Sequence, residues 1–174
     1  MADEKSVGIL VAPSRKRSGR EISVKIAVRY QSRGGNTKAV AEVIANSLGV
    51  KAEPVSSVIA DRVDVLFIGG GVYMGKMDES LYRFLAELNS DNVGQIVCFS
   101  TTGSMASTIN QIKQFAIQKG IIVNKNELLL KMLLQGHSAL GLVGGKLTDK
   151  QIEKIELFTN NVLISTEITS TSIL

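Results

Sequence analysis

The feature that most constrains this chain is a short loop of small and hydroxyl residues, residues 32–37, between two patterned segments. Residues 22–30 before the loop are rich in β-branched residues and predict a strand. The segment after it predicts a helix with one apolar face, because apolar residues recur at helical spacing at Val40, Val43, Ile44 and Leu48. We therefore expect the loop at the carboxyl end of a strand and at the amino end of a helix.

A loop in that position can bind an anion. The first-turn N–H groups of a helix have no intrahelical partner and the helix dipole favours negative charge. Ser32 and Thr37 add hydroxyl donors, and Gly34 and Gly35 let the backbone approach a ligand closely. The motifs of nucleoside-triphosphate loops and of dinucleotide-binding folds are both missing. Taken by itself, the loop indicates a phosphate site and a plain strand-turn-helix about equally.

The composition is that of one globular domain: 174 residues, 44% hydrophobic and 21% charged. The single cysteine, Cys98, excludes an internal disulfide framework and favours a reducing compartment. It lies in a strand-like run, which predicts a small buried side chain. No apolar run approaches the ~20 residues of a membrane span, and the amino terminus does not resemble a signal peptide. We expect a cytoplasmic protein.

The net charge of +4 comes largely from a basic run at residues 15–20, outside the patterned region. No aromatic residue interleaves this run, so we expect no specific nucleic-acid partner. Residues 1–21 are interpreted as a flexible basic extension, residues 22–162 as the folded domain, and residues 163–174 as a Ser/Thr-rich tail that frays from Ser165 to Ser172.

Strand-like and helix-like segments alternate along the folded part. Strands are predicted at 22–30, 50–55, 63–69 and 93–99, apolar runs at 121–123 and 128–134, and helices at 37–48, 78–88, 107–119 and from Thr148 onward. Thr148 and Gln151 form a capping-box pattern at the start of the last helix. Continuous apolar strands imply burial on both sheet faces, so the pattern predicts a parallel sheet with helices on both sides.

Ligands of open α/β sheets bind at the carboxyl ends of the strands. Two further loops stand there: residues 69–77, rich in glycine, and residues 100–105, dense in hydroxyl groups. The lone His137 has no partner at metal-ligand spacing, so we expect no metal site. A phosphoacceptor pocket is also disfavoured, because no acidic cluster is expected at strand ends from Asp61, Asp64, Asp78 and Glu79.

The first loop resembles the flavodoxin signature: an aromatic residue, a hydroxyl residue two positions on, a small residue, a threonine, then alanine and an aliphatic residue. Those positions hold Tyr30, Ser32, Gly35, Thr37, Ala41 and Ile44. Arg29 departs from the family, which usually has an apolar or aromatic residue there, and this hints at an uncovered strand end. The resemblance covers about residues 22–162. It implies a flavodoxin-like, doubly wound α/β domain with five parallel strands in the order 2-1-3-4-5, helices on both faces, and noncovalently bound FMN.

The resemblance also assigns cofactor-binding residues. The FMN phosphate would be held by Ser32, Arg33, Gly34, Gly35, Asn36 and Thr37. One side of the flavin ring would lie against Gly71, Val72, Tyr73, Met74 and Gly75, and the other against Thr101, Thr102, Gly103 and Ser104. The chain has no Trp and only Met105 where relatives often place an aromatic residue, so one ring face is expected to be open or covered by backbone.

Three functions stay open at this point, because a fold does not select among them. The first is an electron carrier between redox partner proteins. The second is an FMN-dependent oxidoreductase acting on a quinone or similar small molecule, of the quinone reductase or protoporphyrinogen oxidase type. The third is an interaction module without flavin. No side chain is assigned as a catalytic acid or base, and the oligomeric state is not predicted.

Overall fold

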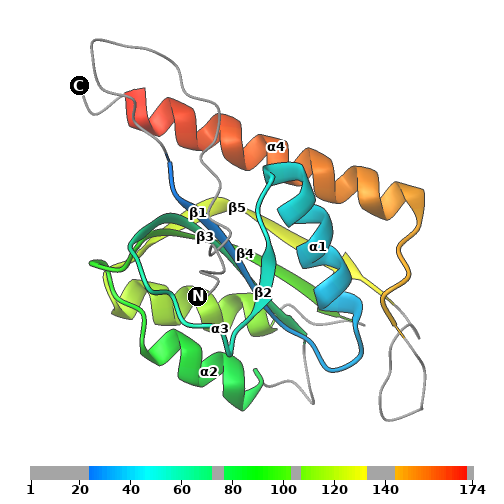
Figure 1. Ribbon diagram of the computed structural model, residues 1–174, viewed down its shortest axis with the longest axis horizontal. Helices are drawn as coiled ribbons and strands as arrows, with labels where there is room; N and C mark the ends of the chain where they lie inside the picture. The colour runs from blue at the N-terminus through cyan, green and yellow to red at the C-terminus, as the bar shows by residue number, and fades with distance from the viewer. Residues whose placement is uncertain (1–23, 72–76, 103–106, 133–143, 172–174) are drawn as a thin grey trace, which may run out of the picture.

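The computed structural model describes residues 24–71, 77–102, 107–132 and 144–171 (Figure 1). Within these residues, strands and helices alternate almost throughout. The elements are β1 (Ile26–Gln31), α1 (Asn36–Leu48), β2 (Ala52–Pro54), β3 (Val63–Gly71), α2 (Glu79–Ala86), β4 (Val93–Thr102), α3 (Ser107–Gln118), β5 (Ile122–Lys131) and α4 (Asp149–Thr171).

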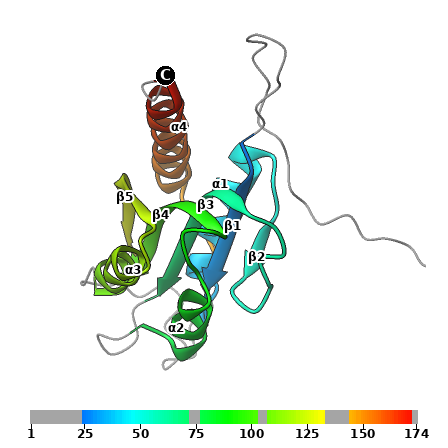
Figure 2. The same ribbon diagram turned by 90° about the vertical axis from the view of Figure 1, so that its left-hand side faces the viewer.

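The strands form one parallel sheet in the order β2-β1-β3-β4-β5, which confirms the predicted topology. Figure 2 shows α2 and α3 on one face of the sheet and α4 on the other, where α1 also packs. The strand order reverses between β1 and β3, so the carboxyl ends of these strands flank the position where ligands of such sheets bind.

Alternate residues of the central strands point to opposite faces of the sheet and contribute to two separate hydrophobic cores. Ile26 and Val28 of β1 pack with α1 and α4, whereas Ala27 packs with α2 and α3. Phe67 of β3 meets Phe158 of α4 edge to face, with ring centroids 6.2 Å apart. The continuous apolar strands are therefore buried on both faces, as the sequence pattern predicted.

Several strands are longer than predicted. β3 continues to Gly71 and β4 continues to Thr102, so five residues assigned to loops, at positions 70, 71 and 100–102, are the last residues of strands. The two predicted apolar runs, 121–123 and 128–134, both contribute to the single strand β5, which spans Ile122–Lys131. Each extension pairs with a neighbouring strand: Gly71 lies opposite Thr101, and Thr102 lies opposite Lys131.

The last helix begins with the predicted capping box. The Gln151 side chain accepts from the Thr148 N–H at 2.9 Å, and the Thr148 hydroxyl accepts from the Gln151 N–H at 3.3 Å. The expected fraying from Ser165 is wrong as far as Thr171, because α4 continues to that residue. Ser165 donates to the Val162 carbonyl and accepts from Asn126, so its hydroxyl joins this end of α4 to β5.

The expectation of an uncovered strand end at Arg29 is also wrong. Its side chain is only 6% exposed and pairs with Glu53 of the edge strand β2, with Nη1 and Oε2 2.7 Å apart. The polar residue is accommodated because an adjacent carboxylate compensates its charge.

Candidate functional site

Three of the predicted site segments start from neighbouring strands. In the register of the sheet, Gln31 of β1 lies opposite Gly70 of β3, and Gly71 lies opposite Thr101 of β4. The first loop, residues 32–37, therefore leaves the sheet beside the ends of β3 and β4. The topology places the three segments at one edge, as expected for a ligand site of a parallel sheet.

The first loop is shaped around Gly35, which precedes helix α1. Gly35 has φ 91°, a left-handed conformation that costs glycine little, and its N–H donates to the Ser32 hydroxyl at 3.1 Å. As the N-cap of α1, Gly35 has no side chain that could make a capping hydrogen bond. The first intrahelical bond at this end runs from the Ala39 N–H to the Gly35 carbonyl. The N–H groups of Thr37 and Lys38, in the first turn of α1, therefore have no intrahelical acceptor, and this is the arrangement that favours a phosphate.

Thr37, in the first turn of α1, contacts the neighbouring strand end. Its hydroxyl oxygen lies 2.7 Å from the hydroxyl oxygen of Thr101, and both residues are buried. Either hydroxyl can donate in this contact. Since each hydroxyl has one hydrogen, the pair keeps one O–H that can donate to a third group.

Arg33 is tied to the start of α2. Its Nε and Nη2 atoms donate to one carboxylate oxygen of Asp78 at 2.8 and 2.5 Å, while the other oxygen accepts from the Ser80 N–H and hydroxyl. Asp78 is thus the N-cap of α2 and a counterion for the first loop. Burial acts to raise the pKa of Asp78, but the bonds from Ser80 and Arg33 outweigh it and the pKa is lowered. The negative charge of Asp78 therefore offsets the positive charge that Arg33 brings to the loop.

Two glycines at the end of β3 are required by packing. A Cβ atom on Gly69 would lie 2.3 Å from the ring of Phe99, and one on Gly70 would lie 2.6 Å from Leu81. The backbone carbonyls at this strand end also accept hydrogen bonds. The Gly70 carbonyl accepts from the Ser100 hydroxyl, and the Gly71 carbonyl accepts from the Thr108 hydroxyl. The glycine-rich stretch that the sequence indicated as a loop thus begins as a closely packed strand end.

Sequence reasoning missed a contact between the first loop and residues more than 100 positions further along the chain. The Gly144 N–H donates to the Gly34 carbonyl at 3.0 Å, and the Gly145 N–H donates to the Asn36 side chain at 2.9 Å. Residues 144 and 145 precede α4, so a fourth segment joins the first loop. The two adjacent glycines before the capping box were the available signal, because Gly145 also adopts a positive φ of 95°.

The structure describes only part of the predicted site. It describes the six residues of the first loop together with Gly71, Thr101 and the backbone of Thr102. The remaining predicted ring contacts lie outside the described residues; they are Val72, Tyr73, Met74, Gly75, Gly103 and Ser104. His137 also lies outside the described residues.

The described residues include neither a helix that could span a membrane nor a cluster that could bind a metal ion. No helix in that part of the chain has the length and apolar character needed to cross a bilayer. The same residues contain no group of three or more His, Cys, Asp or Glu side chains that could hold a metal ion.

Comparison with known proteins gives the class of this fold and site. Residues 27–164 match the family described as the flavodoxin domain, and this chain belongs to that family. A sequence relative is an uncharacterized protein of Methanocaldococcus jannaschii, 31% identical over 84 residues. The match covers 46% of this chain and 55% of that protein, so the similarity spans about half of each.

Solved structures agree on the fold. A flavodoxin from the domain Archaea superposes with a TM-score of 0.65 at 20% identity, covering 82% of this chain and 98% of that one. Flavodoxin 2 from Bacillus cereus gives 0.57 at 14% identity, covering 77% and 94%. The rubredoxin oxygen:oxidoreductase of Desulfovibrio gigas gives 0.63 at 12% identity, covering 82% of this chain but 36% of that chain.

Proposed function

We propose that this protein is a redox protein that binds FMN noncovalently, with the FMN phosphate at the amino end of α1. The observation that carries the proposal is the start of that helix, which has a left-handed Gly35 and no side-chain cap. An anion there replaces the missing acceptors and interacts favourably with the helix dipole. Family membership supports a flavin at this edge of the sheet.

The residues of the first loop fit a phosphate group. Backbone N–H groups at the start of α1 and the remaining O–H of the Thr37 and Thr101 pair would donate to phosphate oxygens. Ser32 would act indirectly, by accepting from the Gly35 N–H and fixing the loop. Arg33 would remain paired with Asp78, so neutral donors would supply most of the binding.

The ring is proposed to lie between the segments that follow β3 and β4. These are Gly71 to Gly75 on one side and Thr101 to Ser104 on the other, with Tyr73 or Met74 against the ring. The bound flavin would supply the redox chemistry, and the protein would set its orientation, its exposure and its potential.

We propose electron transfer to a redox partner protein as the function, in the cytoplasm. A second candidate is an FMN-dependent oxidoreductase acting on a quinone or similar small molecule. It is favoured by the lack of Trp in the chain, since a ring face without an aromatic cover leaves room for a substrate.

The experiment is to add FMN to the purified protein and to follow the quenching of flavin fluorescence. Saturable quenching at one FMN per chain is expected, and a chain that leaves FMN fluorescence unchanged contradicts the proposal. The complex is then reduced and mixed with a one-electron acceptor protein or with a soluble quinone. Faster reoxidation by the protein acceptor supports the carrier, and faster reoxidation by the quinone supports the oxidoreductase.

A further inference from the structure

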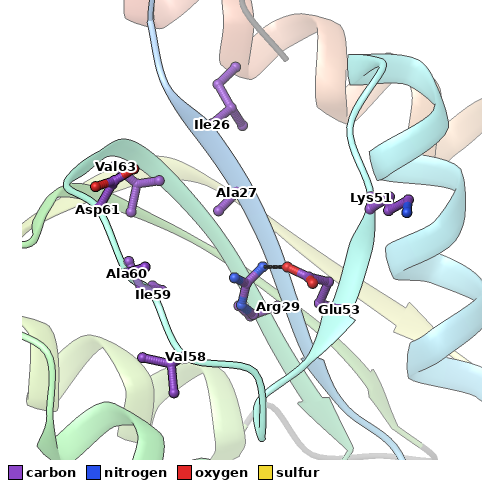
Figure 3. A pocket seen from close by; sticks show the side chains of 10 residues that line it. All are labelled: Ile26, Ala27, Arg29, Lys51, Glu53, Val58, Ile59, Ala60, Asp61 and Val63. Atoms are coloured by element: carbon purple, nitrogen blue, oxygen red, sulfur yellow. Dashed lines mark ion pairs between the residues drawn. The ribbon is translucent and has the colours of Figure 1, made fainter. Parts of the chain in front are cut away.

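The sheet has two edge strands, and they differ in their capacity to accept a further strand. β2 is short, spans Ala52–Pro54 and ends in a proline, and Figure 3 shows its Glu53 in an ion pair with Arg29 of β1. β5 spans ten residues, Ile122–Lys131, and lies at the opposite edge, where no other strand of the described residues pairs with it (Figure 2). Because an edge strand bonds its neighbour through alternate residues, other N–H and C=O groups of β5 point away from the sheet. The outer side of β5 is therefore a template for an added strand.

Only the second half of β5 is regular enough for such pairing. Residues 124–126 of β5 lie opposite a single residue of β4, Val97, and form a bulge. A bulge bends and twists a strand and hinders the pairing of another strand beside it. Residues 127–131 then pair in uninterrupted register with residues 98–102 of β4. An added strand would therefore pair with residues 127–131.

This five-residue segment has an acid at one end, Glu127, and a base at the other, Lys131. Leu128 and Leu130 are buried in the core that the sheet forms with α1 and α4. Leu129 packs on the opposite face, against the core with α2 and α3, and Glu127 pairs with a lysine of α3 on that same face. Lys131 is the next residue of this alternation and is exposed. The two charged side chains and Leu129 therefore share one face of the sheet.

This charge pattern is complementary to a second copy of itself. In an antiparallel pair centred on Leu129, Glu127 of each copy lies opposite Lys131 of the other copy, and opposite charges in that position are stabilising. A parallel pair in register would place like charges opposite each other and would be destabilised. We propose that two copies of this protein associate through residues 127–131 of β5, in antiparallel pairing, and join their five-stranded sheets into one. The two copies are related by a two-fold axis, so the assembly closes at a dimer.

Both charged side chains can form this contact without breaking one within the single chain. The Glu127 side chain is 38% exposed, and a carboxylate has two oxygens, so its ion pair with Lys113 does not use all its acceptor positions. Lys131 belongs to none of the ion pairs found among the described residues. Leu128 and Leu130 are already buried, so backbone bonds and the two ion pairs would hold the dimer together. Such a short interface predicts a weak dimer.

The first experiment is sedimentation velocity of the whole wild-type chain, from low micromolar to submillimolar concentrations. A monomer–dimer equilibrium with a dissociation constant in the micromolar range is expected. A monomer at every concentration, which means an edge that stays bare or accepts a different protein, overturns the proposal. Assembly beyond the dimer also overturns it, because a two-fold contact uses the outer side of β5 in both copies and leaves none for a third.

Charge reversal locates the contact. Lys131→Glu and Glu127→Lys, each studied alone, place like charges opposite each other at both ends of the pair. The dissociation constant of the dimer should therefore rise by about fivefold or more in each variant. A mixture of the two variants restores an acid opposite a base at both ends, so heterodimers are expected at the wild-type affinity. Dimerisation of Lys131→Glu at the wild-type affinity, or a mixture of the two folded variants that stays monomeric, overturns the proposal.

The matched control is Lys125→Glu, which makes the same charge change on the same strand but within the bulge, outside the proposed pairing. Dimerisation at the wild-type affinity is expected for it. An equal loss in Lys125→Glu would mean that net charge or another register drives the association, and would overturn the proposal. Glu127→Lys also loses the ion pair with Lys113. If that variant does not fold, the comparison of Lys131→Glu with Lys125→Glu decides.

Discussion

The hydroxyl oxygens of Thr37 and Thr101 lie 2.7 Å apart, although 64 residues separate the two in the chain. One belongs to the first turn of α1 and the other to the end of β4. Their contact joins the proposed phosphate loop to a segment proposed to face the flavin ring. A substitution at either residue should therefore change the affinity for the cofactor.

Replacing Thr37 with Val should weaken FMN binding by roughly tenfold or more. The substitution keeps the size of the side chain but removes the hydroxyl, and a hydrogen bond to a charged acceptor contributes about 1.5–3 kcal/mol. Riboflavin, which lacks the phosphate, should bind with little change. Fluorescence titration of both flavins measures the difference. The matched control is Thr159→Val in α4, whose hydroxyl donates to the Ile155 carbonyl of its own helix.

Thr101→Val distinguishes the contribution of the Thr37 hydroxyl to FMN binding from that of the Thr101 hydroxyl. It removes the same Thr37 to Thr101 hydrogen bond but leaves the Thr37 hydroxyl able to donate. FMN affinity should fall less than in Thr37→Val. Equal losses in both variants would mean that Thr37 acts through Thr101 and not on the phosphate.

Asp78→Asn should reduce the loss of unfolding free energy that occurs as the pH falls into the acid range. The pKa of Asp78 is lowered in the folded protein, so its ionised form stabilises the fold above the unfolded value of about 3.9. That contribution is lost as the pH falls through the lower folded value. Asparagine keeps an oxygen for the Ser80 N–H but not the charge for Arg33. Urea unfolding between pH 3 and pH 7 is the measurement.

The control for Asp78 is Glu79→Gln, because Glu79 is exposed and pairs with Arg83 within the same helix. Its stability curve should follow the wild type. A wild-type acid slope in Asp78→Asn would contradict the role given to the Arg33 contact.

Gly69→Ala should destabilise the protein by about 3 kcal/mol, since the added Cβ would overlap both the ring and the carbonyl of Phe99. Gly120→Ala is the comparison, because open space surrounds Gly120 and only its φ of 67° opposes a side chain. Its cost should be about 1 kcal/mol. Denaturant unfolding of both variants tests this. A smaller loss for Gly69→Ala than for Gly120→Ala would contradict the packing argument.

Cys98 should be unreactive in the folded protein. Burial raises the pKa of its thiol to about 12, so almost no thiolate exists at pH 8, and its side chain is 1% exposed. A thiol reagent should modify it only when the chain unfolds, with one equivalent consumed in urea. Rapid modification at pH 8 without denaturant would contradict its buried position on β4, in the core that the sheet forms with α2 and α3.

The sequence predicted the layers of this fold because each core-facing pattern is local. The apolar run 65–68 and the apolar stripes of the helices indicate which faces are buried. The capping box of Thr148 and Gln151 is a signal within four residues. The Ser/Thr-rich end of α4 was mispredicted because composition alone does not show that Ser165 contacts Asn126 of β5.

The site was predicted less completely, because its contacts are long-range. The signature of the first loop lies within fifteen residues. The contacts of Arg33 with Asp78, and of Asn36 with Gly145, join residues 45 and 109 positions apart. Arg29 shows the same limit: its charge suggested exposure, and only the pairing of β1 with β2 brings Glu53 beside it.

The central claim is that the amino end of α1 binds the terminal phosphate of FMN. Calorimetric titration of the wild-type protein with FMN and with riboflavin, under identical conditions, tests it most directly. The account predicts FMN binding at one per chain, tighter than riboflavin by roughly tenfold or more, since the phosphate adds at least one charged hydrogen bond. Riboflavin binding as tightly as FMN would contradict it.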